Sequence, residues 1–78
     1  MMKKIIIMQK GIYKHYKGQN YKVIGVSRHT ETLEEMVVYE SLYGNHDLWV
    51  RPLNMFQEKI IHKGVEIPRF TCIQTDEK

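Results

Sequence analysis

The 78-residue sequence contains no alanine, only one cysteine and two prolines, and no long run of apolar residues. Without alanine, the strongest helix former, no segment shows the apolar stripe of an amphipathic helix. A single cysteine, Cys72, excludes an internal disulfide and hence a disulfide-stapled secreted domain, and we expect it to be buried. No stretch approaches the roughly 20 apolar residues that span a bilayer. The sequence therefore predicts a cytoplasmic protein with no membrane partner.

The residue types that are abundant are typical of β-strands. The chain has nine isoleucines, six valines, four threonines and five tyrosines, in short runs separated by glycine, asparagine and proline. The pattern predicts five or six short strands, a bulge at Gly25, and one 3₁₀ turn over residues 52–56 with Leu53 and Phe56 pointing inward. Because so short a chain cannot leave one sheet face bare, we expect an all-β, small closed SH3-like barrel, with an OB-like barrel as the alternative.

The length allows only one domain. We predict a single small β-barrel domain over residues 11–74. Residues 1–10 are expected to be an N-terminal extension or an edge strand, and residues 75–78 a frayed tail.

Several motifs, in order along the chain, resemble a family of short bacterial domains of unknown function. They are Gly11-x-Tyr13-x-His15-Tyr16-Lys17-Gly18, Tyr21-x-Val23-x-Gly25-Val26-x-Arg28-His29-x-Glu31-Thr32-Leu33-Glu34, Val37-Val38-Tyr39, Leu42-Tyr43-Gly44, Leu48-Trp49-Val50-Arg51-Pro52-Leu53-x-Met55-Phe56 and Pro68-Arg69-Phe70. The resemblance covers about residues 11–70. It implies a shared small-barrel fold in an uncharacterised bacterial protein, and it implies no activity.

The sequence carries none of the common motifs of catalysis or cofactor binding. Glycine-rich phosphate-binding patterns are missing, and the four histidines lie 14 to 17 residues apart. Zinc ligands generally come in close sequence pairs that include cysteine. We therefore expect no enzymatic activity, no metal and no cofactor.

Aromatic side chains provide the leading functional hypothesis. A barrel of this size cannot enclose all of them, and tyrosine and tryptophan bury well only when their polar tips find a partner. We therefore interpret the protein as a non-catalytic module that binds a protein or peptide through an aromatic and charged face. The alternative, in which these side chains are core residues and cross-strand pairs, stays open. The residues expected on the face are Tyr13, His15, Tyr39, Tyr43, Trp49 and Arg51.

The charge distribution provides a second hypothesis. Residues 1–28 contain seven basic and no acidic residues, whereas residues 29–78 contain five basic and nine acidic residues. Basic residues interleaved with tyrosines suit a surface that tracks phosphates and stacks bases. The alternative is therefore a small nucleic-acid-binding barrel, unless folding offsets the charges of the two parts. Its binding residues would be Lys14, Lys17, Lys22 and Arg28.

The polar segment 28–35 provides the third hypothesis, a small enzyme or ligand-binding protein. Its candidate residues are Arg28, His29, Glu31 and Glu34, with His29 as acid or base and Glu31 orienting it. The alternative is a solvated loop in which Glu31 or Glu34 pairs with Arg28 or Arg51. The sequence predicts no particular oligomeric state.

Overall fold

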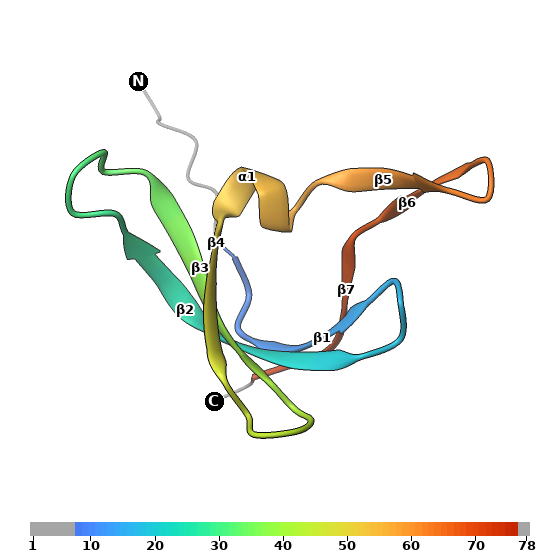
Figure 1. Ribbon diagram of the computed structural model, residues 1–78, viewed down its shortest axis with the longest axis horizontal. Coiled ribbons are helices and arrows are strands. Elements are labelled where there is room, and N and C mark those ends of the chain that lie inside the picture. Colours follow the sequence, from blue (N-terminus) through green and yellow to red (C-terminus); the bar gives the residue numbers. More distant parts are fainter. Residues whose placement is uncertain (1–7, 77–78) are drawn as a thin grey trace.

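The computed structural model describes residues 8–76, which form an antiparallel β domain with one helical turn (Figure 1). The predicted all-β class is confirmed. The expected count of five or six strands was too low, because Pro68 and Arg69 divide the end of the chain into strands that join different sheets. The elements are β1 (Gly11–His15), β2 (Asn20–Arg28), β3 (Glu35–Ser41), β4 (Leu48–Pro52), α1 (Leu53–Phe56), β5 (Lys59–His62), β6 (Val65–Pro68) and β7 (Phe70–Thr75).

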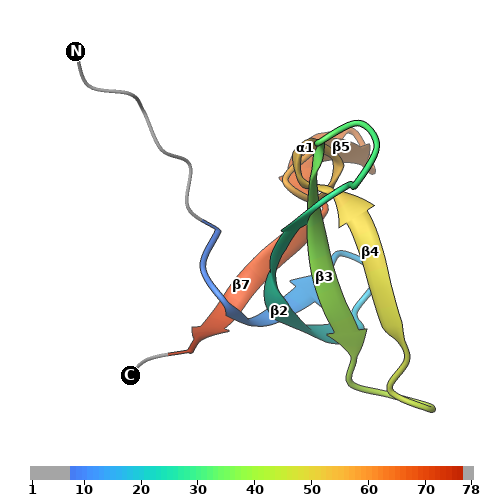
Figure 2. The same ribbon diagram turned by 90° about the vertical axis from the view of Figure 1, so that its left-hand side faces the viewer.

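Five strands form one antiparallel sheet in the order β4-β3-β2-β1-β7, and β5 and β6 form a separate hairpin. Figure 2 shows β2, β3 and β4 side by side, with β1 and β7 crossing behind them at a steep angle. The long strand β2 pairs with both β1 and β3, and its register against β3 shifts between Val23 and Gly25. This irregularity confirms the bulge predicted at Gly25, and such bulges bend a strand.

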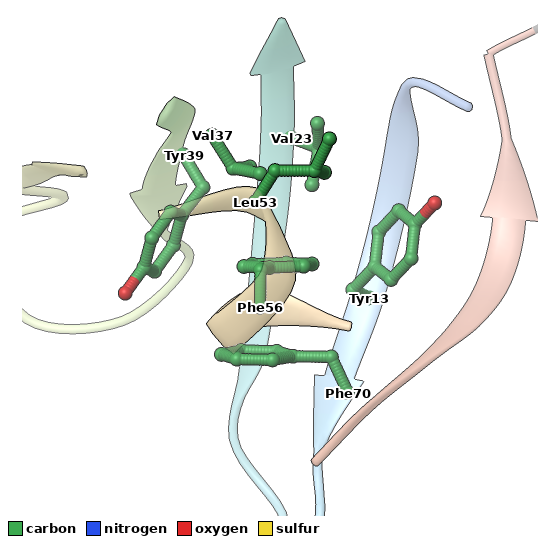
Figure 3. Packing of buried hydrophobic residues seen from close by; sticks show 7 residues of the cluster. All are labelled: Tyr13, Val23, Val37, Tyr39, Leu53, Phe56 and Phe70. Carbon is green, nitrogen blue, oxygen red and sulfur yellow. The ribbon is translucent and has the colours of Figure 1, made fainter. Parts of the chain in front are cut away.

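The core lies between the bent sheet and α1 (Figure 3). Phe56 of α1 is only 1% exposed, and its ring stacks on Phe70 of β7 with the centroids 4.0 Å apart. Tyr13 and Tyr39 meet the same ring edge-on at 5.6 and 5.2 Å. The one-turn helix therefore inserts its side chain between strands from opposite parts of the sheet. The buried hydrophobic cluster consists of Tyr13, Val23, Val37, Tyr39, Leu53, Phe56 and Phe70.

The turn after β4 is α-helical, not the 3₁₀ turn that the sequence suggested. The amide of Gln57 donates to the carbonyl of Leu53 at 3.0 Å, four residues back, which is the α-helical spacing. Pro52 closes β4 and precedes the helix, where its missing amide hydrogen costs no ladder bond. The predicted inward orientation of Leu53 and Phe56 is confirmed, since both are buried.

The ends of the described chain lie against each other. The amide of Asp76 donates to the carbonyl of Lys10 at 2.9 Å, and β7 extends to Thr75. Cys72 is half-buried and packs against the core. Residues 1–7 and 77–78, which include most of the predicted N-terminal extension and half of the predicted tail, lie outside the described residues. Within residues 8–76, no helix has the length and apolar character needed to cross a membrane.

Candidate binding face

Five rings contact one another in sequence along one surface of the domain. The centroids of successive rings are 5.6, 6.4, 4.7 and 5.3 Å apart, and most of the contacts are edge-to-face. The rings come from five elements or turns, which the fold brings together. In spatial order the rings, which we call the aromatic row, are Tyr43, Tyr21, His15, Tyr16 and His62.

Strand alternation and register explain why the central rings lie together. Side chains two apart share a strand face, so His15 lies on the same side of β1 as the core residue Tyr13. Tyr21 lies directly opposite Tyr13 on β2, and Phe70 lies opposite His15 on β7. The face that builds the core therefore continues outward into the aromatic row.

One end of the row, His62, lies at the end of a strand, and the other, Tyr43, lies in a turn. Tyr16 follows β1, and its ring meets that of His62 at the end of β5. In Figure 1 the β1–β2 turn and the β5–β6 hairpin project from the same side of the molecule, which is what brings these two rings together. At the other end, Tyr43 in the β3–β4 connection is 41% exposed.

Buried rings form the floor of the row. Phe70 meets His15 at 4.9 Å and Tyr21 at 5.7 Å, and Tyr39 meets Tyr21 at 5.5 Å. Tyr21 also forms a hydrogen bond with Tyr43 through their hydroxyl oxygens, which are 2.8 Å apart. These contacts restrain the rings, and restraint of this kind reduces the entropy cost when aromatic side chains bind a ligand.

Three cations surround the row. The Nε of Arg51 donates to the Tyr39 hydroxyl at 3.2 Å, and its guanidinium carbon lies 5.8 Å from the centroid of Phe70. The ammonium of Lys17 lies 5.9 Å from the ring of Tyr16. Arg69 precedes Phe70 and forms an ion pair with Glu58 at 3.2 Å. Cationic side chains therefore lie beside the floor of the row and beside Tyr16.

His15 is held in its neutral form at the centre of the row. Its Nδ1 accepts the amide hydrogen of Lys17 at 3.2 Å, so the proton of the neutral ring lies on Nε2. Burial lowers the pKa of His15 below its usual 6.5, and the positive charges of Arg51, Arg69 and Lys17 lower it further. At neutral pH the imidazole therefore presents a hydrogen-bond donor without adding a charge.

A shallow hollow of about 400 Å³ adjoins the row between the β1–β2 turn and strands β6 and β7. His15 and Tyr16 line it together with Ile67 and Pro68, and the rest of the lining, Lys14, Thr71 and Ile73, comes from the sheet face opposite the core. This volume is within the range of small-ligand pockets. The hollow therefore opens toward the sheet face opposite the core and meets the row only at His15 and Tyr16.

The structure brings together half of the residues predicted for the binding face. His15, Tyr43 and Arg51 belong to the row or contact its floor. Trp49 lies opposite Tyr39 on the edge strand β4 and is exposed, but it has no ring contact with the row among the described residues.

The prediction that Tyr13 and Tyr39 lie on the exposed face is wrong. They are 8% and 5% exposed, so they belong to the core and support the face without presenting surface. Burial is tolerated because each hydroxyl has a partner: Tyr13 donates to the Gln9 carbonyl at 2.7 Å, and Tyr39 accepts from Arg51.

Sequence reasoning did not select several residues that matter for this surface. Alternation along β2 was the available signal for Tyr21, because it shares a strand face with the apolar Val23. The residues not selected for the face are Tyr16, Tyr21, His62, Arg69 and Phe70.

The basic residues of the nucleic-acid hypothesis are separated in the structure. Lys14 and Lys22 lie on the sheet face opposite the row, and Lys22 neighbours Glu40 across the strands. Arg28 lies at the end of β2 and donates to the Leu33 carbonyl at 3.2 Å. Of the four residues, Lys17 contacts a ring of the aromatic row, and Lys14 lines the hollow that meets the row at His15 and Tyr16.

The 28–35 segment is an exposed loop closed by its own hydrogen bonds. The Nδ1 of His29 accepts from the amides of Glu31 at 3.1 Å and Thr32 at 3.4 Å. Among residues 8–76, Glu31 and Glu34 form no ion pair with Arg28 or Arg51. Glu34 borders a hollow of about 310 Å³ beside α1, but His29 and Glu31 do not line it. The two groups proposed for acid–base chemistry therefore do not converge on a common cavity.

Two tyrosines should titrate late because the fold favours their neutral form. Burial raises the pKa of Tyr13 and of Tyr21 from 10.0 to about 12, and the Tyr43 hydrogen bond contributes for Tyr21. The folded state then holds more protons than the unfolded state in this range, so stability falls as the pH rises from 10 to about 12. In a pH titration followed by tyrosinate absorbance, Tyr21→Phe and Tyr13→Phe should each lack one of the tyrosines that titrate late in the wild-type protein. Titration curves unchanged by both substitutions would contradict the burial of these hydroxyls.

The fold is a small antiparallel β domain that carries a row of contacting aromatic rings. The chain belongs to the family described as "Protein of unknown function (DUF1653)", which matches residues 11–72. It is also similar to a DUF1653 protein from Bordetella bronchiseptica whose crystal structure is known, with 32% sequence identity and a TM-score of 0.81. The similarity covers 91% of this chain and 94% of the Bordetella chain. No curated protein matches the sequence. The resemblance to a bacterial family of unknown function is thus confirmed.

Proposed function

We propose that this domain is a non-catalytic module that binds an extended segment of a partner protein along the aromatic row. The observation that carries the proposal is the continuity of the five rings, supported from below by Phe70 and Tyr39. Rings that meet edge-to-face leave shallow indentations between them, and peptide-binding grooves use such rings for apolar and proline side chains. Tyrosine is suited to this role because it offers a large contact area with few rotatable bonds.

We further propose that the fold is an SH3-like barrel. The support is its topology: a four-stranded meander, a single helical turn, and a last strand that returns to pair with β1. In this view Phe56 of α1 occupies the space between the edge strand β7 and β3, the neighbour of the other edge strand β4. The two edges of the sheet would then be joined by the packing of the Phe56 side chain and not by backbone hydrogen bonds between β4 and β7.

Single-stranded nucleic acid is the second candidate ligand, because it also uses rings flanked by cations. The distribution of charge favours a peptide. Two of the four predicted phosphate contacts, Lys14 and Lys22, lie on the opposite sheet face. The turn that carries Tyr43 also carries Asp47, which would repel a polyanion at that end of the row.

Peptides selected from a random linear display library provide the test. Tyr16→Ala and His62→Ala should each weaken binding of a selected peptide about 5- to 10-fold, the effect of truncating a contributing interface residue. Leu48→Ala is the matched control, because Leu48 is exposed on the other face of β4. Fluorescence anisotropy measures the affinity of the peptide for the wild-type protein and the three variants. Equal affinities in all four proteins would contradict the proposal. A library that yields no peptide whose binding depends on the row would contradict it as well.

A further inference from the structure

Three side chains that carry hydrogen-bond donors lie next to Phe70: Arg51 lies over its ring, His15 meets the ring edge-on, and Arg69 precedes it in the chain. The Nε of Arg51 is occupied by Tyr39, but within residues 8–76 its two terminal nitrogens have no hydrogen-bond or ion-pair partner. The Nε of Arg69 is buried and has no partner in the same part of the chain. His15 offers its Nε2 hydrogen, because Nδ1 is already occupied. The three side chains thus present donors and no free acceptor.

The backbone fixes these groups at the centre of the row. The carbonyl of Arg69 accepts from the Tyr16 amide at 2.9 Å, and the amide of Arg69 donates to the Glu58 carbonyl at 3.0 Å. Arg51 is held over Phe70, the ring that also packs against His15. Arg51 and Arg69 also both act electrostatically on His15. Arg51 and His15 therefore contact the same ring, and the backbone of Arg69 is fixed beside that ring.

We infer that Arg51, Arg69 and His15 form a carboxylate-binding subsite in the middle of the aromatic row. This inference rests on the proposed function, and it specifies the ligand as a peptide with a carboxylate that reaches this point. The carboxylate comes either from an aspartate or glutamate side chain or from the C-terminus of the peptide.

The chemistry of the site favours a carboxylate. A guanidinium presents a planar pair of N–H groups that matches the two oxygens of a carboxylate, and such charge-assisted bonds are among the stronger ones in proteins. The nearby carboxylate of Glu58 already offsets part of the charge of Arg69, so a single negative charge fits better than a string of phosphates.

The test combines changes in the peptide with changes in the protein. Selected peptides should contain an acidic residue or depend on a free C-terminus. Replacing the acidic side chain by its amide, or amidating the C-terminus, identifies which carboxylate is bound. One of the two changes should weaken binding to the wild-type protein about 10- to 100-fold, the effect of losing a charge-assisted contact at a hot spot. The same change should have little further effect on Arg51→Met.

Two further variants guard against a loss of folding in Arg51→Met, which also removes a bond to Tyr39. Arg69→Met should give the same reduced sensitivity to the peptide carboxylate, and Arg28→Met, away from the row, should bind like wild type. In NMR titrations the peptide should also raise the pKa of His15, because its carboxylate offsets the surrounding positive charge.

The outcomes separate this inference from the proposed function. If Tyr16→Ala weakens binding but both neutralised peptides bind as well as the parent peptide, the carboxylate subsite is wrong and the peptide-binding face stands. If Tyr16→Ala binds like wild type, the face itself is wrong. Tighter binding of single-stranded DNA than of any selected peptide, with a steep salt dependence, would overturn the inference in favour of phosphate recognition.

Discussion

Phe56→Ala is expected to lower the free energy of unfolding by about 3–5 kcal/mol, the usual cost of truncating a buried phenylalanine. Phe56 is the residue that α1 contributes to three ring contacts, with Phe70, Tyr13 and Tyr39. Small domains have total stabilities of about 5–15 kcal/mol, so a large share of the stability would be lost. Urea denaturation followed by Trp49 fluorescence measures the change.

The same helix provides the control. Met55 is 45% exposed, so Met55→Ala should cost less than about 1 kcal/mol while changing the same four-residue helix. A loss in Phe56→Ala no larger than in Met55→Ala would mean that α1 does not fill the core. The account of how the two edges of the sheet are joined would then fail as well.

Gly11→Ala is the second change with a large expected effect. Gly11 begins β1 with a φ of +145°, and a Cβ atom there would overlap the Gln74 carbonyl oxygen and lie 2.9 Å from the Thr75 Cα. Backbone atoms of a paired strand cannot move aside as a flexible side chain can. The cost combines backbone strain of about 1–3 kcal/mol with overpacking of a similar size, giving about 2–5 kcal/mol.

Gly18→Ala separates the two contributions. Gly18 also has a positive φ, +107°, but its Cβ would meet nothing within 4 Å. It should therefore show the strain contribution alone, about 1–3 kcal/mol. Chemical denaturation of both variants makes the comparison, and a Gly11→Ala cost equal to that of Gly18→Ala would contradict the close approach of β1 and β7. That approach matters for function because β7 carries Phe70, the floor of the aromatic row.

The strands could be predicted because their signal is local. β-branched residues and alternation indicate β3, and the proline followed by Leu53 and Phe56 indicates an inward-facing helical turn. Alternation also shows which side chains share a strand face, but not which of them the rest of the fold covers. For this reason Tyr13 and Tyr39 were assigned to the exposed face, although α1 and β7 bury them.

The aromatic row could not be predicted in full because its contacts are not local. His62 belongs to a hairpin outside the main sheet, yet it contacts Tyr16 from the first turn. The residue pattern of one segment does not indicate which distant segment will pack against it. The effect of the charge asymmetry also depends on contacts between segments that are distant in the sequence. Lys22 faces Glu40 and Arg28 faces Glu35 across β2 and β3, so strand pairing offsets part of the basic character of residues 1–28.

The most direct test of the central claim is an NMR map of the wild-type protein during titration with a selected peptide. The account predicts the largest shifts of ring and amide resonances along the aromatic row, from Tyr43 through His15 to His62, with Ile12, Lys22 and Leu48 on the opposite sheet face unchanged. Shifts concentrated on that opposite face, with the resonances of the row unperturbed at saturation, would contradict it.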